Sequence, residues 1–319
     1  MFEHLNFGPW LDVAARSALG AGPVMRDENQ DNCVLIDAAG HAACLVEGLP
    51  QARAIPGWPP GHVRLAVLDG MGGHGHGREA AEAAAAGLLA IPACHDVDTL
   101  SRHLERLHGA LQRHFDLLDD DPARPGTTLT LLELPAPGSG GALLWHAGDS
   151  RLYEITQAGA QALSVDHVPA TVLATAGLIE EDAWRRQVHG RHGSQIAQAF
   201  ILGNTFADPA HLADGLFALT PEILPPWLRA LPDRRALALR ADALYLLATD
   251  GFWSCADPAS FVGRWPQLLA QQGAAGAIEA LFGAMETQPP SGLQPDNLTA
   301  IALRLRHPGC DETALPQSP

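Results

Sequence analysis

The sequence predicts an α+β fold whose strands pair mainly in antiparallel fashion. The expected elements follow the order strands, helices, a run of strands, helices and strands, which differs from the steady alternation of a doubly wound parallel sheet. Several strand-like segments also follow one another across short turns. The chain has 319 residues and shows neither an internal repeat nor a convincing linker, so we expect a single large domain.

Besides the apolar run at 65–68, six strands are predicted from runs rich in β-branched, aromatic or other apolar residues that are bounded by turn-forming residues. They span residues 127–134, 142–147, 151–155, 161–164, 243–249 and 298–305. The first two are joined by PAPGSGG and the next two by QAGA, so each pair is expected to be an antiparallel neighbour pair.

Helical spacing is clearest in two regions. In residues 99–118, apolar side chains recur every three or four positions on one face. A second helical region covers residues 261–271 and 274–285. Residues 41–62 are expected to form a loop or a long hairpin. We assign residues 1–306 to the domain and expect residues 307–319 to be a disordered tail.

Charge and composition exclude several classes of function. The formal net charge is −16, and no basic cluster offsets it, so we expect no binding to nucleic acid or to a membrane surface. No apolar run approaches the length of about 20 residues that a membrane span needs, and the N-terminus does not resemble a secretory signal. The cysteines are odd in number, scattered and without a C-x-x-C pair, which favours reduced thiols and a cytoplasmic protein.

Residues 65–89, LAVLDGMGGHGHGREAAEAAAAGLL, contain the spacing of a dinucleotide-binding loop. Gly70, Gly72 and Gly75 match G-x-G-x-x-G between a predicted strand and a predicted helix. However, Asp69 directly precedes the first glycine, and its carboxylate would repel a pyrophosphate. The next segment is also an amphipathic helix where a nucleotide fold needs a parallel strand. A dinucleotide site is therefore the weakest alternative.

Acidic residues recur at the ends of predicted strands. Asp69 follows LAVL and Asp250 follows ALYLLAT, and a glycine comes after each. Because both strands end in Asp-Gly, we expect the two carboxylates side by side at one edge of a sheet. Two more aspartates lie beside predicted strands: Asp149 in WHAGDSR follows one, and Asp296 in QPDNLTAIALRL precedes one. A further acidic stretch, RDENQD, lies near the N-terminus.

This combination of acids favours a site for divalent metal ions. A single Asp-Gly is usually only a turn, but several buried carboxylates are costly unless cations neutralise them. Hard oxygen ligands in this number suit Mg²⁺ or Mn²⁺. The glycine after Asp69 would also let its own carbonyl turn toward a metal ion.

Seven motifs, read in order, resemble those of the metal-dependent PP2C-type (PPM) protein serine/threonine phosphatases of the bacterial type. They are RDENQD, LAVLDGMGGHG, GTTLTLLEL, WHAGDSRLY, LSVDHV, LLATDGFW and PDNLTAIAL. The resemblance extends from about residue 12 to residue 305, and residues 166–205 resemble the helical flap of that family. It implies a four-layer α-β-β-α sandwich of two antiparallel sheets.

The resemblance also implies a centre with two Mg²⁺ or Mn²⁺ ions. Asp69 would bridge both ions, and the carbonyl of Gly70 would bind one of them. Asp250 and Asp296 would hold the other ion, and Asp31 would order a water molecule bound to the metal. The hydroxide between the two ions would attack the phosphorus atom of phosphoserine or phosphothreonine.

Two further roles follow from the resemblance. Asp149 lies where many members bind a looser third metal ion, and Arg26 lies five residues before Asp31, where the family places its phosphate-binding arginine. Arg26 and Asp69 are thus the expected catalytic residues. The expected partners are phosphorylated proteins made by a Ser/Thr kinase, and the chain is expected to act as a monomer.

Two positions depart from the pattern of many members. Gln30 replaces a glutamate that acts through water, and Met71 replaces the histidine of animal relatives, although many bacterial relatives also read D-G-M-G-G-H. The proton for the leaving group would then come from water or from His74. As for metal binding, His74 and His76 are more simply explained as exposed loop residues than as metal ligands. Because of Gln30, a pseudophosphatase that acts as a binding module stays open, as does a hydrolase of small phosphate esters. Asp166 and His167 are expected to fix the start of the flap.

Overall fold

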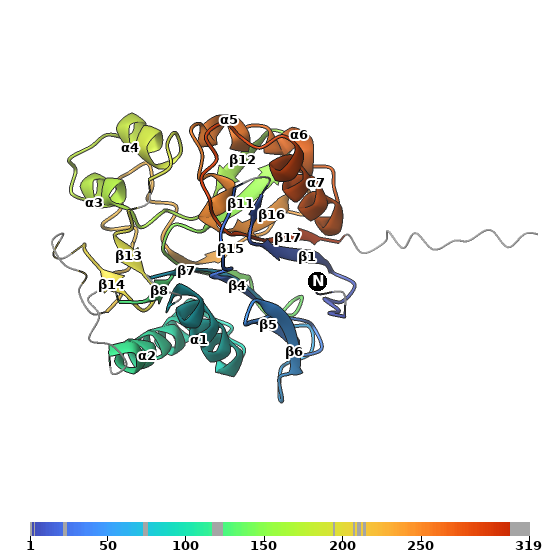
Figure 1. The fold of residues 1–319 in the computed structure, drawn as a ribbon. Helices are drawn as coiled ribbons and strands as arrows, with labels where there is room; N and C mark the ends of the chain where they lie inside the picture. The colour runs from blue at the N-terminus through green and yellow to red at the C-terminus, as the bar shows by residue number, and fades with distance from the viewer. Residues whose placement is uncertain are drawn as a thin grey trace, which may run out of the picture.

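The structure is a computed structural model that describes residues 2, 4–21, 24–72, 76–116, 124–193, 195–206, 208, 212 and 215–306. Within these residues two antiparallel sheets lie face to face, and helices cover both outer faces (Figure 1). The predicted α+β sandwich of four layers is confirmed. The expected tail at 307–319 lies outside the described residues.

The larger sheet has the strand order β15-β10-β9-β7-β4-β5-β6, and β8 pairs with β7. Its strands are β4 (Asp31–Ile36), β5 (His41–Val46), β6 (Leu49–Ala54), β7 (Val63–Met71), β8 (Gly126–Thr127), β9 (Leu129–Leu134), β10 (Ala142–Ala147) and β15 (Arg234–Leu237). The strand β7 is antiparallel to both of its neighbours, β4 and β9, which excludes the parallel sheet of a dinucleotide fold.

The smaller sheet has the order β1-β17-β16-β11-β12. Its strands are β1 (Leu11–Ala18), β11 (Arg151–Thr156), β12 (Gly159–Ala162), β16 (Leu244–Ala248) and β17 (Leu298–Leu305). Two short hairpins lie outside these sheets, β2 (Gly20–Ala21) with β3 (Val24–Met25) and β13 (Gln198–Ala199) with β14 (Gly203–Asn204). The strand expected at 161–164 begins two residues earlier, because Thr156 already pairs with Gly159 across a tight turn.

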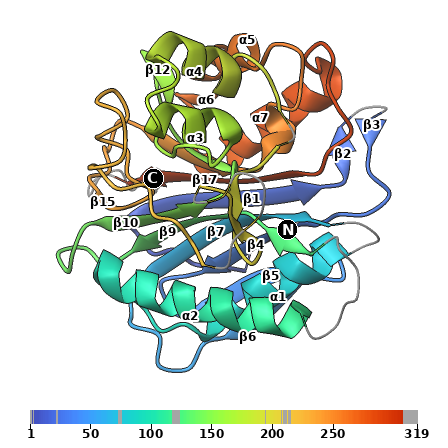
Figure 2. The same ribbon diagram turned by 90° about the vertical axis from the view of Figure 1, so that its left-hand side faces the viewer.

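Helices α1 (His76–Ala90) and α2 (Val97–Asp116) cover the larger sheet, and α5 (Pro258–Val262), α6 (Trp265–Leu269) and α7 (Ala274–Thr287) cover the smaller one. Figure 2 shows α1 and α2 below the sheets and the other helices above them. No helix in the described part of the chain is long and apolar enough to cross a membrane.

Three apolar cores separate the four layers. Along β7, Leu65 and Val67 pack between the two sheets, whereas Ala66 and Leu68 face α1 and α2. The alternation arises because successive side chains of a strand point to opposite faces. Burial on both faces explains why this strand is a continuous apolar run in the sequence.

The segment at 41–62 is the hairpin that was one of its two predicted forms. Strands β5 and β6 are joined by Glu47 and Gly48, whose φ angles are 52° and 71°. Positive φ at both central residues is the geometry of a type I′ turn, which matches the twist of antiparallel strands.

The flap begins after β12 and contains α3 (Pro169–Thr175) and α4 (Glu181–Val188). It has an apolar cluster of its own, in which Trp184 and Val188 pack with Leu219, Leu224 and Leu228. The packed unit thus includes side chains beyond residue 205, where the resemblance places the end of the flap. Figure 1 shows α3 and α4 beside the end of the two sheets.

Candidate metal centre and phosphate site

The acidic residues meet where the ends of the two sheets come together. Asp69 lies near the end of β7 and is paired in register with Asp31, the first residue of β4. Asp250 follows β16 and begins the short 3-10 helix Asp250–Phe252. The expectation that Asp69 and Asp250 lie at one edge of a single sheet is wrong, because β7 and β16 belong to different sheets. Stacking of the sheets brings the two carboxylates together.

One cavity of about 780 Å³ joins most of the predicted site. Its lining includes Asp69, Gly70, Asp149, Asp250, Asp296 and Arg26. Asp31 is buried beside this cavity, where one of its carboxylate oxygens accepts a hydrogen bond from the Thr249 hydroxyl at 2.8 Å. The structure therefore gathers every residue that the sequence analysis assigned to metal or phosphate.

The carboxylates of this cluster resist ionisation. Burial and then the charge of Asp250 raise the pKa of Asp69 well above its usual value, and burial with Asp149 does the same to Asp250. Burial raises the pKa of Asp31 to about 7 even though hydrogen bonds from threonines oppose it. Burial and repulsion by Asp166 raise the pKa of Asp149 to about 7 as well. The cluster therefore has a deficit of positive charge.

The donor set fits divalent metal ions. Burial and then the charge of Asp250 raise the pKa of Asp69, so a proton on one of the two carboxylates lowers their repulsion. A hard cation would take the place of that proton and relieve the repulsion. Within the described ranges, no three acidic, histidine or cysteine side chains already converge on one point. The fit therefore rests on the chemistry and charge of the donors.

Two glycines allow the acidic strand ends to approach their neighbours. A Cβ atom on Gly70 would lie 2.2 Å from the carbonyl oxygen of Gly77 and 2.4 Å from that of Gln30. A Cβ atom on Gly251 would lie 2.0 Å from the carbonyl oxygen of Asn297. Both Asp-Gly pairs therefore need glycine for close backbone packing beside the carboxylates, which is a steric reason that the sequence alone did not supply.

We expect Gly70→Ala to reduce both stability and turnover. The new methyl group must displace backbone at the start of α1, which costs about 1–3 kcal/mol, and a shift of about 1 Å at the site can lower turnover about a hundredfold. Gly283→Ala is the matched control, because Gly283 lies within α7 and a Cβ there meets nothing within 4 Å. Urea unfolding and phosphatase assays of both variants test this; equal behaviour of the two would contradict it.

Arg26 lies at the mouth of the cavity. Its Nε donates to the carbonyl of Pro295 at 2.8 Å, and its Nη2 donates to Asp296 Oδ1 at 2.9 Å. The side chain is 49% exposed, so the guanidinium remains within reach of solvent. Asn297 ties the same two segments together, because its Oδ1 accepts from the Gln30 amide at 2.9 Å. Sequence reasoning did not assign a role to this asparagine, although it stands in the PDN motif.

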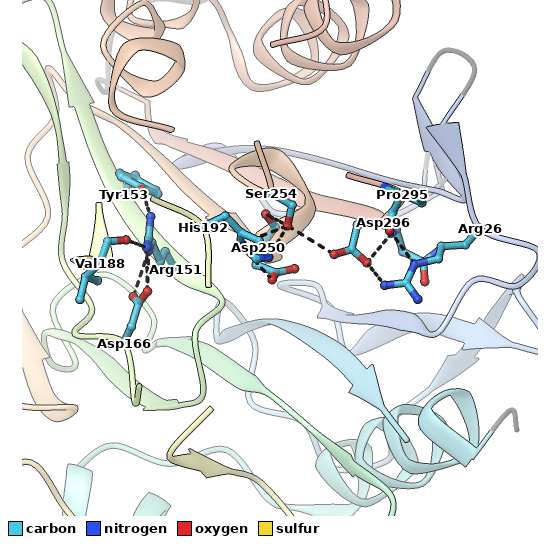
Figure 3. A network of polar contacts seen from close by, with 11 residues as sticks. Arg26, Arg151, Tyr153, Asp166, Val188, His192, Asp250, Ser254, Pro295 and Asp296 are labelled. Carbon is cyan, nitrogen blue, oxygen red and sulfur yellow. Dashed lines mark hydrogen bonds and ion pairs between the residues drawn. The ribbon is translucent and has the colours of Figure 1, made fainter. Parts of the chain in front are cut away.

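His192 is a second residue that the sequence analysis missed. It comes from the flap, after α4, and its Nδ1 lies 3.9 Å from Asp250 Oδ2. The Ser254 hydroxyl lies within 3.4 Å of the His192 ring and of Asp296 Oδ2, and it donates to the Asp250 carbonyl at 3.1 Å. Figure 3 shows His192, Asp250 and Ser254 between the Arg26–Asp296 pair and Arg151. Burial lowers the pKa of His192.

Two contacts hold the flap against the loop that carries Asp149. Arg151 binds Asp166 through its Nε and Nη2, with the closest distance at 2.7 Å. His167 accepts a hydrogen bond from the Gly148 amide at 3.0 Å, and its other ring nitrogen lies 3.1 Å from Asp233 Oδ2. The contacts of Asp166 and His167 agree with their expected role at the start of the flap.

Of the two histidines in the glycine-rich stretch, the structure describes His76, which does not line the cavity. His74 lies outside the described residues. His76 begins α1, and its Nδ1 lies 3.2 Å from Glu79 Oε2, three residues further along the same helix. The expectation that His76 is a loop residue is therefore wrong, because it is the first residue of a helix.

No protein-family model matches the chain. Among solved structures, the PPM Ser-Thr phosphatase MsPP from Mycobacterium smegmatis, in complex with cacodylate, is 25% identical with a TM-score of 0.58. The match covers 94% of this chain and 100% of that one. The chain resembles the PPM phosphatases in fold and in sequence. Its motifs, its two stacked sheets and its acidic cavity all accord with that resemblance.

Two further relatives extend the comparison. One is the catalytic domain of the serine/threonine protein phosphatase PstP in complex with two manganese ions, which has the same fold. Its sequence is 22% identical and its TM-score is 0.57, and the match covers 93% of this chain and 99% of that one. "Probable protein phosphatase 1N" from Homo sapiens is 31% identical over 224 residues, or 66% of this chain. The chain spans 46% of the length of that curated relative, which is about half.

Proposed function

We propose that this chain is a metal-dependent phosphatase that hydrolyses phosphoserine and phosphothreonine in proteins. The observation that carries the proposal is the cavity in which four aspartates meet an accessible arginine, Arg26, with a fifth aspartate, Asp31, buried beside it. The naming of the relatives as Ser/Thr phosphatases supports the same substrate class. We further propose that the substrates come from a Ser/Thr kinase, and that the chain acts as a monomer in the cytoplasm, where the four cysteines of the described residues, all buried and free, would stay reduced.

The proposed metal ligands are the residues that the resemblance assigns. Asp69 and the Gly70 carbonyl would hold one Mg²⁺ or Mn²⁺ ion, Asp69, Asp250 and Asp296 would hold a second, and Asp149 would contribute to a third. When bound, such ions lower the pKa of water and withdraw charge from phosphate oxygens. The two manganese ions in the PstP complex support this choice of metal.

The side chains of the protein supply binding and orientation. Asp31 is held by Thr249 and lies beside Asp69, where it can accept a proton from an attacking water. Arg26 offers forked N–H groups to the equatorial phosphate oxygens, whose charge it offsets. Because Arg26 is paired with Asp296 in the structure, phosphate must compete with that carboxylate for the guanidinium.

One observation favours a second candidate, a binding module without turnover. Gln30 lines the cavity, and its Oε1 would lie 3.0 Å from a Cβ atom on Gly77, beside the Gly70 backbone. An amide there provides one negative charge fewer than the glutamate of many family members. Weak metal binding restored by Gln30→Glu would identify this case.

The test is hydrolysis of a phosphothreonine peptide after EDTA treatment and return of Mn²⁺ or Mg²⁺. We expect activity only with metal, and higher kcat/KM for phosphopeptides than for nucleotides or sugar phosphates. A folded protein that binds metal but hydrolyses none of these would contradict the proposed activity. A preference for the small esters would replace the protein substrate with a small molecule.

Arg26→Ala is expected to weaken phosphate binding more than it slows hydrolysis of the bound substrate. Loss of a charge-assisted contact costs about 1.5–3 kcal/mol, so KM should rise about tenfold to a hundredfold. The measurement is steady-state kinetics at saturating Mn²⁺, with inorganic phosphate inhibition as a second readout. Arg240→Ala is a suitable control, since Arg240 pairs with Asp242 on the surface and does not line the cavity. Unchanged KM in Arg26→Ala would argue against the phosphate role.

A further inference from the structure

A second cavity of about 360 Å³ adjoins the acidic cavity beneath the flap. Asp149, His192 and Gly193 line both cavities, so the two spaces share a wall at the proposed metal centre. The volume lies at the lower end of the range for small-ligand sites, about 300–1,000 Å³. It suits a side chain of a bound peptide better than a folded segment.

The charged groups that line the second cavity include Asp149, Arg151, Asp166 and Arg191. Arg151 and Asp166 form a forked pair at its base, and Arg151 also donates to the Val188 carbonyl at 2.7 Å (Figure 3). Asp149 belongs to the proposed metal centre. The exposed Arg191 also lines the cavity, and in the described part of the chain it makes no hydrogen bond or ion pair.

The other walls of the second cavity suit the aliphatic part of an acidic side chain. Val168, Pro169 and Trp253 offer apolar contacts, and Gln187 and Gln195 offer amides that donate hydrogen bonds. A carboxylate whose methylene groups lie against the apolar wall could reach Arg191. An ammonium or guanidinium group there would meet Arg191 as a like charge.

We propose that Arg191 selects phosphoprotein substrates that carry an acidic side chain next to the phosphorylated residue. This inference rests on the proposed phosphatase function and names its substrate class more closely. An extended peptide advances about 3.3–3.6 Å per residue, so a side chain one or two positions from the phosphoresidue can enter the adjoining cavity while the phosphate occupies the acidic one.

The test compares phosphothreonine peptides that differ only in flanking residues, with glutamate, glutamine or lysine on either side. We expect wild-type kcat/KM to be about threefold to fivefold higher for glutamate than for glutamine, as for an exposed ion pair, and lowest for lysine. Arg191→Gln should remove this preference, and Arg191→Lys should keep most of it. Activity toward p-nitrophenyl phosphate should not change in either variant, since that ester has no flanking residue.

Arg186→Gln is the matched control. Arg186 is also an exposed flap arginine for which the described residues provide no ion pair, but it lines a different cavity, between α4 and α5. Arg186→Gln should therefore keep the preference for glutamate. Equal preference in wild type and Arg191→Gln, or a parallel loss of p-nitrophenyl phosphate activity in Arg191→Gln, would overturn the inference. Absence of all hydrolysis by the wild type would instead reject the proposed function.

Discussion

Asp250→Asn is expected to lower kcat by at least about a thousandfold while it stabilises the metal-free protein. The amide cannot replace a carboxylate as a metal ligand, and metal ions contribute several kcal/mol to such reactions. In the metal-free state, however, the substitution removes a buried charge that Asp149 and Asp296 repel. The amide can also donate to Asp69. We expect a melting temperature about 2–4 °C higher in EDTA, which corresponds to about 1 kcal/mol.

The measurements are steady-state kinetics, calorimetric Mn²⁺ titration and thermal unfolding in EDTA and in Mn²⁺. Mn²⁺ should stabilise the wild type more than the variant, because binding to the native state alone raises its stability. Asp257→Asn is a control at an exposed aspartate that only caps α5. A variant of Asp250 that binds Mn²⁺ like the wild type would remove Asp250 from the metal centre.

Glu133→Gln is expected to destabilise the fold by about 3–5 kcal/mol, because it leaves the buried guanidinium of Arg64 without its counter-charge. Both side chains are fully buried, with Arg64 Nε 2.6 Å from Glu133 Oε2. Arg64 also donates to the carbonyls of Leu88 and Ile91 at the end of α1. The loss should therefore loosen the contact between α1 and the larger sheet.

Urea unfolding at several pH values measures this effect. Burial opposes ionisation of Glu133, but Arg64 and His62 outweigh it and lower the pKa of this carboxyl. A lowered pKa stabilises the fold above the usual value of 4.5, and this contribution is lost as the pH falls through the pKa of the folded state. The difference between wild type and variant should thus be large at pH 7 and shrink in acid. Asp242→Asn, in an exposed pair with Arg240, should leave the free energy of unfolding nearly unchanged.

Two of the strands that the sequence predicted with the observed bounds are buried along most of their length. Strands β10 and β17 have the predicted bounds, and both are apolar runs. Strand β6 is exposed along its whole length at the edge of the sheet, so LPQARA has no apolar pattern to read. The Glu47-Gly48 turn also lacks the usual Asn-Gly or Asp-Gly signal. For both reasons the sequence could not separate a hairpin from a loop at 41–62.

The flap residues that face the site were beyond sequence reasoning. His192 and Arg191 stand in GRHG, which has no helical or strand period, and many exposed loops have similar composition. Their positions depend on the forked pair of Arg151 with Asp166 and on packing of Trp184 within the flap. Such contacts join residues far apart in the chain, so local patterns do not reveal them.

The sequence by itself determined the chemistry of the site, namely aspartates beside strand ends and glycines after two of them. These features are local, because a strand and the turn that ends it are written in neighbouring residues. Only the tertiary structure decided that Asp69 and Asp250 come from different sheets, and that Arg191 lines a cavity beside them. The reason is that stacking of the sheets and docking of the flap depend on apolar burial summed over distant segments, which no single stretch of sequence contains.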